Sequence, residues 1–154
     1  MILGVGNLLL GDEGIGVEAI RHLENLGFDT LADLVDGGTG GFHLLGLFRE
    51  YQHIILIDAT MDGKPPGTVT LMKPRFASDY PQSLSAHDIG LKDLIESAAL
   101  LGSLPTVDLI TISVGALSSM SLDLSDPVKA ALPEIEKAVA RCLGGCAEPS
   151  EARF

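Results

Sequence analysis

Four residues of this sequence combine metal-binding or proton-transferring side chains with positions at the ends of predicted strands: Glu13, Asp36, Asp58 and His87. Two carboxylates and a neutral imidazole form an oxygen, oxygen and nitrogen ligand set that suits a borderline divalent ion, with water in the open positions. A carboxylate that is not a ligand can act as a general base. These residue types therefore predict a small metal or acid–base site, provided that the fold brings them together.

Each of these residues also has a structural interpretation. Asp36 or Asp58 could serve only as the N-cap of the following helix. Glu13, together with Asp12, could interact with the positive end of a helix dipole. His87 could be a simple helix-start residue. A functional site requires all four residues to meet at one edge of a sheet.

The segments around these residues alternate between strand and helix patterns. Apolar runs predict strands at residues 1–5, near 34–36, at 53–58, at 68–72 and at 107–114, with helices between most of them. Right-handed crossovers then predict one α/β domain, a mostly parallel twisted sheet of about five strands with helices on both faces. Residues 68–72 follow the third strand too closely for a helical crossover, which predicts a short antiparallel or edge strand. In such a sheet ligands bind beyond the carboxyl ends of the strands.

The C-terminal third predicts a last helix and a tail. Ser125, Asp126 and Pro127 give the cap and early proline of a helix, which Pro133 is expected to kink or restart. We assign residues 1–143 to the domain and expect residues 144–154, which are polar and rich in small side chains, to be a flexible tail. Cys142 and Cys146 are expected to be structural or incidental.

Composition excludes several classes of partner. A net charge of −11 with scattered Lys and Arg argues against binding to nucleic acid or to an anionic membrane surface. No secretion signal and no run of about 20 apolar residues is present, which predicts a cytoplasmic protein. The glycine-rich opening is not a dinucleotide fingerprint either, because Leu9 stands where the third glycine belongs and Asp12 and Glu13 would repel a pyrophosphate.

Four motifs of the chain resemble those of the nickel-iron hydrogenase maturation endopeptidases. Residues 4–17 (GVGNLLLGDEGIGV) are similar to the family's opening signature, residues 36–39 (DGGT) to its glycine-rich turn, and residues 57–59 (IDA) to its third-strand acid. Residues 85–91 (SAHDIGL) resemble its histidine loop, although Asp88 replaces the glutamine that many members have there. The likeness covers residues 1–143.

The resemblance implies an aspartic-type endopeptidase that recognises nickel already inserted in the precursor of a hydrogenase large subunit and removes a short C-terminal extension. It places the metal contacts at Glu13, Asp58 and His87 and gives Asp36 a role in catalysis. The nickel belongs to the precursor, so we expect no tightly bound cofactor of the enzyme's own, and we expect a monomer. Two other classes stay open: a nucleotide-dependent oxidoreductase, and a metallochaperone that carries nickel without cutting. The sequence leaves the cleavage chemistry open.

Overall fold

The computed structural model describes residues 1–81, 91–102, 104–116 and 120–145. They form one α/β domain around a five-stranded sheet in the order β2-β1-β3-β5-β4. The strands are β1 (Ile2–Gly4), β2 (Leu34–Asp36), β3 (His53–Thr60), β4 (Val69–Met72) and β5 (Thr106–Ser113). All neighbouring strands pair in parallel except β4, which pairs antiparallel with β5. The predicted fold class and the antiparallel edge strand are confirmed.

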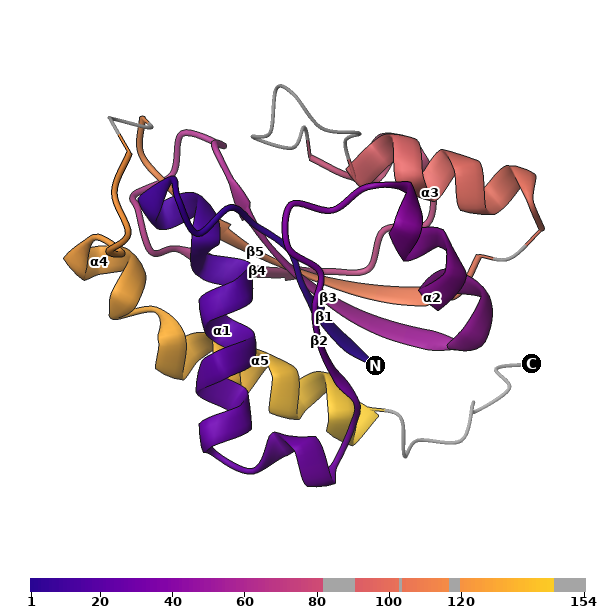
Figure 1. The fold of residues 1–154 in the computed structure, drawn as a ribbon, viewed down its shortest axis with the longest axis horizontal. Helices are drawn as coiled ribbons and strands as arrows, with labels where there is room; N and C mark the ends of the chain where they lie inside the picture. Colours follow the sequence, from indigo (N-terminus) through magenta and orange to yellow (C-terminus); the bar gives the residue numbers. More distant parts are fainter. Residues whose placement is uncertain (82–90, 103, 117–119, 146–154) are drawn as a thin grey trace, which may run out of the picture.

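The helices lie on both faces of the sheet, as predicted (Figure 1). They are α1 (Ile15–Asn25), α2 (Leu45–Glu50), α3 (Leu91–Leu100), α4 (Asp126–Lys129) and α5 (Leu132–Gly145), and the 3-10 turns are η1 (Gly11–Gly14), η2 (Phe28–Thr30), η3 (Phe42–Leu44) and η4 (Ala77–Asp79). α1 and α5 cover one face, and α2 and α3 cover the other.

The pleat of β3 explains why its residues 54–57 (IILI) are aliphatic without interruption. Ile55 and Ile57 pack in the apolar cluster on the α1 and α5 face, whereas Ile54 and Leu56 pack in the cluster on the α2 and α3 face. Burial of one such side chain stabilises the fold by about 1.5–3 kcal/mol relative to an exposed position. A strand covered on both faces needs apolar residues at every position, which is the pattern from which β3 was predicted.

The end of the chain follows the proline signals. α4 ends at Lys129, and a new helix starts at Leu132 with Pro133 as its second residue, where the missing N–H of proline costs no helical hydrogen bond. Pro133 therefore restarts the helix, as expected. α5 continues to Gly145, so it includes the first two residues of the predicted tail, and residues 146–154 lie outside the described part. In the described residues, no helix has the length and apolar character needed to cross a membrane.

The strand order creates one special position at the carboxyl edge. From β1 the chain moves to β2 on one side and then returns to β3 on the other side of β1. The direction of strand progression therefore reverses between β1 and β3. In open α/β sheets, this switch point is where a crevice for ligands forms.

Candidate functional site at the carboxyl edge of the sheet

Glu13 lies at this switch point, in the 3-10 turn η1 that joins β1 to α1. It is buried, with 4% of its surface exposed. The surrounding glycines let this turn pack directly on β1. A Cβ at Gly6 would lie 2.1 Å from the carbonyl oxygen of Glu13, and one at Gly16 would lie 2.1 Å from that of Val5. The glycines of the opening motif thus serve close backbone packing around a buried acid, which explains their spacing without a phosphate ligand.

Asp58 approaches the same point from β3. It pairs in register with Thr111 and stands two residues before the end of the strand, because Ala59 and Thr60 continue the pairing with β5. The residue is half-buried as a whole, whereas its carboxyl group is closely surrounded by protein. Burial raises the pKa of Asp58 to about 8; a hydrogen bond from the Ala59 N–H (2.8 Å) lowers this pKa, and the charge of Glu13 raises it further.

The structure therefore brings together two of the three predicted metal contacts, Glu13 and Asp58. Two carboxylates that repel each other in a poorly hydrated place form a natural cation site, because a divalent ion removes the repulsion and stabilises both charged forms. The third predicted contact, His87, lies outside the described residues. Within residues 1–81, 91–102, 104–116 and 120–145, no group of three His, Cys, Asp or Glu side chains is arranged to hold a metal.

Asp36 ends β2 and is exposed at the edge of the sheet next to β1. Its Oδ1 accepts a hydrogen bond from the Gly38 N–H at 2.8 Å, which closes a turn of its own loop. This turn is bound to the β1 segment on both sides: Gly37 donates to the Gly4 carbonyl at 2.8 Å, and Gly6 donates to the Gly38 carbonyl at 2.7 Å. Asp36 thus lies beside the loop that carries Glu13, while its carboxylate is bonded to its own turn.

One contact at the carboxyl edge, between Asp12 and Ser125, was not predicted from the sequence. The carboxylate of Asp12 accepts two hydrogen bonds from Ser125, from the backbone N–H at 2.6 Å and from Oγ at 2.7 Å. A cavity of about 300 Å³ lies between the loops that follow β1 and β5, and both residues line it. Asp12 was interpreted as a helix-dipole partner. Because 113 residues separate Asp12 from Ser125, no local pattern could have revealed the contact.

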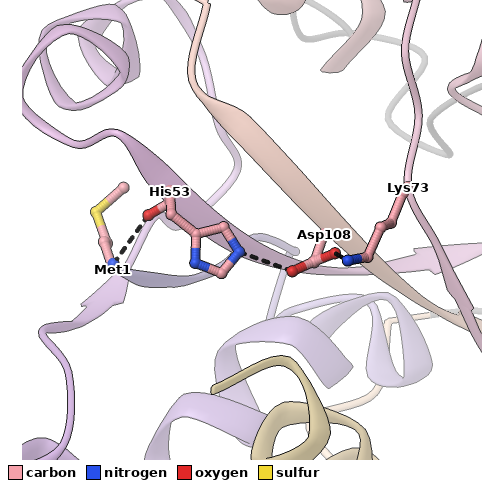
Figure 2. A network of polar contacts seen from close by, with 4 residues as sticks. All are labelled: Met1, His53, Lys73 and Asp108. Atoms are coloured by element: carbon pink, nitrogen blue, oxygen red, sulfur yellow. Dashed lines mark hydrogen bonds and ion pairs between the residues drawn. The ribbon is translucent and has the colours of Figure 1, made fainter. Parts of the chain in front are cut away.

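A second polar network lies at the opposite, amino-terminal edge of the sheet (Figure 2). Oδ2 of Asp108 in β5 is 2.7 Å from Nε2 of His53 in β3, and Oδ1 is 3.6 Å from Nζ of Lys73, which follows β4. The Met1 amino group donates to the His53 carbonyl at 3.1 Å. The side chain of Asp108 is 4% exposed. This network joins neighbouring strands far from Glu13 and Asp58, so we assign it to the stability of the fold.

Comparison with known proteins identifies the family of this chain. The family model described as hydrogenase maturation protease matches residues 17–142. The hydrogenase expression/formation protein HupM of Azotobacter chroococcum mcd 1 is 34% identical over 154 residues, covering 96% of this chain and 71% of HupM. HupD of Thiocapsa roseopersicina is 36% identical, covering 68% of this chain and 49% of HupD. The hydrogenase 2 maturation protease of Escherichia coli is 34% identical, covering 68% of this chain and 66% of that protein.

Solved structures with a similar fold are also hydrogenase maturation peptidases. The solved structure of the hydrogenase maturating endopeptidase HybD from E. coli superposes with a TM-score of 0.80 at 28% identity, covering 95% of this chain and 92% of HybD. The maturation peptidase of hydrogenase 2 from a Thaumarchaeota archaeon gives a TM-score of 0.71 at 28% identity, covering 93% of this chain and 96% of that one. The chain therefore belongs to the hydrogenase maturation protease family, which is a family of peptidases.

Proposed function

We propose that this protein removes a C-terminal extension from the precursor of a nickel-iron hydrogenase large subunit once nickel has been inserted. The observation that supports this proposal best is the pair of acidic side chains, Glu13 and Asp58, at the switch point of a hydrogenase-maturation-protease fold. A pair of acids in this place favours a cation, and in this proposal the cation is the nickel of the precursor.

Nickel recognition depends on the mixed donor set. Glu13 and Asp58 supply hard oxygen donors, which would accept magnesium or calcium as well, whereas the imidazole of His87 favours nickel. Binding of the ion would release the proton that Asp58 holds below its raised pKa. In this way the two acids attract the metal and the histidine selects it. The same three residues let the enzyme distinguish a nickel-loaded precursor from an empty one.

Asp36 is the proposed general base. Its exposed carboxylate lies at the carboxyl edge beside the loop of Glu13. In a hydrolytic scheme, water adds to the scissile carbonyl carbon and gives a proton to this carboxylate, and that proton then passes to the departing amine. The general-base assignment is consistent with an aspartic-type endopeptidase. We further propose that the enzyme acts in the cytoplasm as a monomer, which cell fractionation and light scattering test.

A processing assay tests the whole proposal. Purified protein is incubated with nickel-loaded and with nickel-free precursor, and the products are weighed by mass spectrometry. We expect a shortened precursor and a released C-terminal peptide only from the nickel-loaded sample. Metal binding without any cut would instead favour the metallochaperone, and equal cutting of both samples would contradict nickel recognition.

The variant His87→Ala tests, in the same assay, whether His87 is the residue that selects nickel. Since His87 supplies the nickel-favouring ligand, the variant is expected to retain the wild-type unfolding temperature and to lose processing of the nickel-loaded precursor. A normal rate with His87→Ala would remove this residue from the mechanism. The family assignment would remain.

A further inference from the structure

The contact between Asp12 and Ser125 fixes a distant loop beside the proposed site. Residues 120–125, here called the 120–125 segment, lie between β5 and α4, and Asp12 directly precedes Glu13 in η1. The carboxylate of Asp12 bonds to both the N–H and the Oγ of Ser125. Hydrogen bonds to an ionised carboxylate are stronger than those between neutral groups, and Asp12 accepts two of them from Ser125.

Two further contacts hold the same segment. Leu10 and Ser121 form an isolated parallel β-bridge, and the Gly11 N–H donates to the Ser121 carbonyl at 2.6 Å. Gly11 has a φ of +57°, and a Cβ there would lie 3.2 Å from the Asp123 carbonyl oxygen. The two loops therefore approach each other as closely as a glycine permits. Asp12 supplies the only side-chain carboxylate among these contacts in the described residues.

The segment held in this way presents apolar side chains to solvent. Met120 is 76% exposed and Leu122 is 75% exposed. Beside them, the cavity of about 300 Å³ is lined by Asp12, Gly115 and Ser121 among others. Met120 and Leu122 flank the lining residue Ser121 in the sequence, and exposed apolar side chains of this kind can form part of a surface that meets another protein. Glu13 directly follows Asp12, which lines this cavity, so a protein that docks here lies next to the proposed nickel-recognition site.

We propose that Asp12 is a positioning residue that holds the 120–125 segment beside Glu13 as a wall against which the precursor polypeptide docks. This inference rests on the proposed function, because the precursor is the partner that must reach Glu13. Asp12 acts through geometry: its two bonds to Ser125 set the place of Leu122 and of the cavity wall. A docking contact that is the same in the bound precursor and in the transition state changes KM and leaves kcat unchanged, so loss of this position should weaken precursor binding more than the chemical step.

Four variants separate this role from a direct role of the charge. Asp12→Ala breaks both bonds to Ser125, and Ser125→Ala breaks only the bond from Oγ. Asp12→Asn removes the charge, yet the amide oxygen still accepts from the Ser125 N–H and the amide nitrogen can donate to Oγ. Asp29→Ala removes an exposed acid of η2 and is the matched control for charge.

The expected result is a rise in KM of roughly fivefold or more for Asp12→Ala, a smaller rise for Ser125→Ala, and values close to wild type for Asp12→Asn and Asp29→Ala, with kcat little changed throughout. Leu122→Ser should also raise KM, while Leu100→Ser, an 89% exposed leucine at the end of α3, should not. Precursor affinity measured by calorimetry should change in the same order.

Two outcomes would overturn the inference. Wild-type KM and affinity in both Asp12→Ala and Leu122→Ser would show that the segment does not meet the precursor. An equal loss in Asp12→Asn and Asp12→Ala would show that Asp12 acts through its charge. If the wild-type protein binds the precursor but does not cut it, the proposed function fails, and the affinities still decide whether Asp12 positions the segment.

Discussion

At the scale of single residues, Asp58 has an unusual environment, because this acid directly follows the buried aliphatic residues 54–57 in β3. Burial and the charge of Glu13 keep its pKa near 8. The unfolded chain releases this proton at a much lower pH, so between the two pKa values the folded protein binds more protons than the unfolded one. The contribution of Asp58 to the free energy of unfolding therefore falls as pH rises from about 4 to about 8.

We predict that Asp58→Asn stabilises the metal-free protein at neutral pH and removes part of this pH dependence. The slope that one proton contributes is up to about 1.4 kcal/mol per pH unit. The amide oxygen can still accept the bond from Ala59, so the strand is preserved. Urea unfolding between pH 5 and 8 measures the slope, and the processing assay should show no activity. An unchanged slope in the variant would mean that Asp58 is ionised in the folded protein.

Local sequence patterns were sufficient for the elements but insufficient for contacts between distant loops. The aliphatic run of β3, the short distance to β4 and the restart at Pro133 all arise from nearby residues, and each was predicted correctly. The strand order could not be predicted, since it depends on which faces pack against each other. The bonds between Asp12 and Ser125 were also inaccessible, because the sequence favoured a local role for each: a helix-dipole partner for Asp12 and a helix cap for Ser125, whose side chain makes no cap bond in the structure. Glu13 and Asp58 were proposed because Glu13 follows the first predicted strand and Asp58 ends the third, although β3 continues for two residues beyond Asp58.

The packing of α1 on β1 and β3 gives an element-scale prediction. A Cβ at Gly16 would lie 2.1 Å from the Val5 carbonyl oxygen and 2.6 Å from that of Ile57, and neither backbone atom can move away. We predict that Gly16→Ala lowers the free energy of unfolding by about 3 kcal/mol or more, the upper end of overpacking effects.

Gly46→Ala in α2 is the matched control for this helix substitution. A Cβ at Gly46 meets nothing within 4 Å, so the change should stabilise the protein by about 0.5–1 kcal/mol through helix propensity. Thermal and denaturant unfolding of the two variants measure whether Gly16→Ala destabilises the protein and Gly46→Ala stabilises it. A mild effect of Gly16→Ala would mean that α1 can shift away from the sheet.

At the scale of the whole molecule, two groups of charged side chains lie at opposite edges of the sheet. The carboxyl edge holds Glu13 and Asp58, whose mutual repulsion favours a cation. The amino edge holds Asp108 with His53 and Lys73, which are attractive partners (Figure 2). In our proposal the carboxyl edge binds the nickel of the precursor, whereas the amino edge stabilises the fold.

We predict that Asp108→Ala lowers the free energy of unfolding by about 1–3 kcal/mol, since it removes the acceptor that faces His53 from a buried position. Processing of the nickel-loaded precursor by the folded variant should keep the wild-type kcat and KM. Unfolding curves and the processing assay together measure both effects. Loss of processing at a temperature where the variant is folded would show that the two edges are coupled.

The two outer strands of the sheet are short, with three residues in β2 and four in β4. An outer strand exposes unpaired backbone groups, and long flat ones recruit strands from other molecules. Such brief strands offer a neighbouring molecule few positions to pair with, which disfavours chain-to-chain aggregation through the sheet. A protease of this family can in this way present its acidic carboxyl edge to another protein while its lateral edges resist self-association.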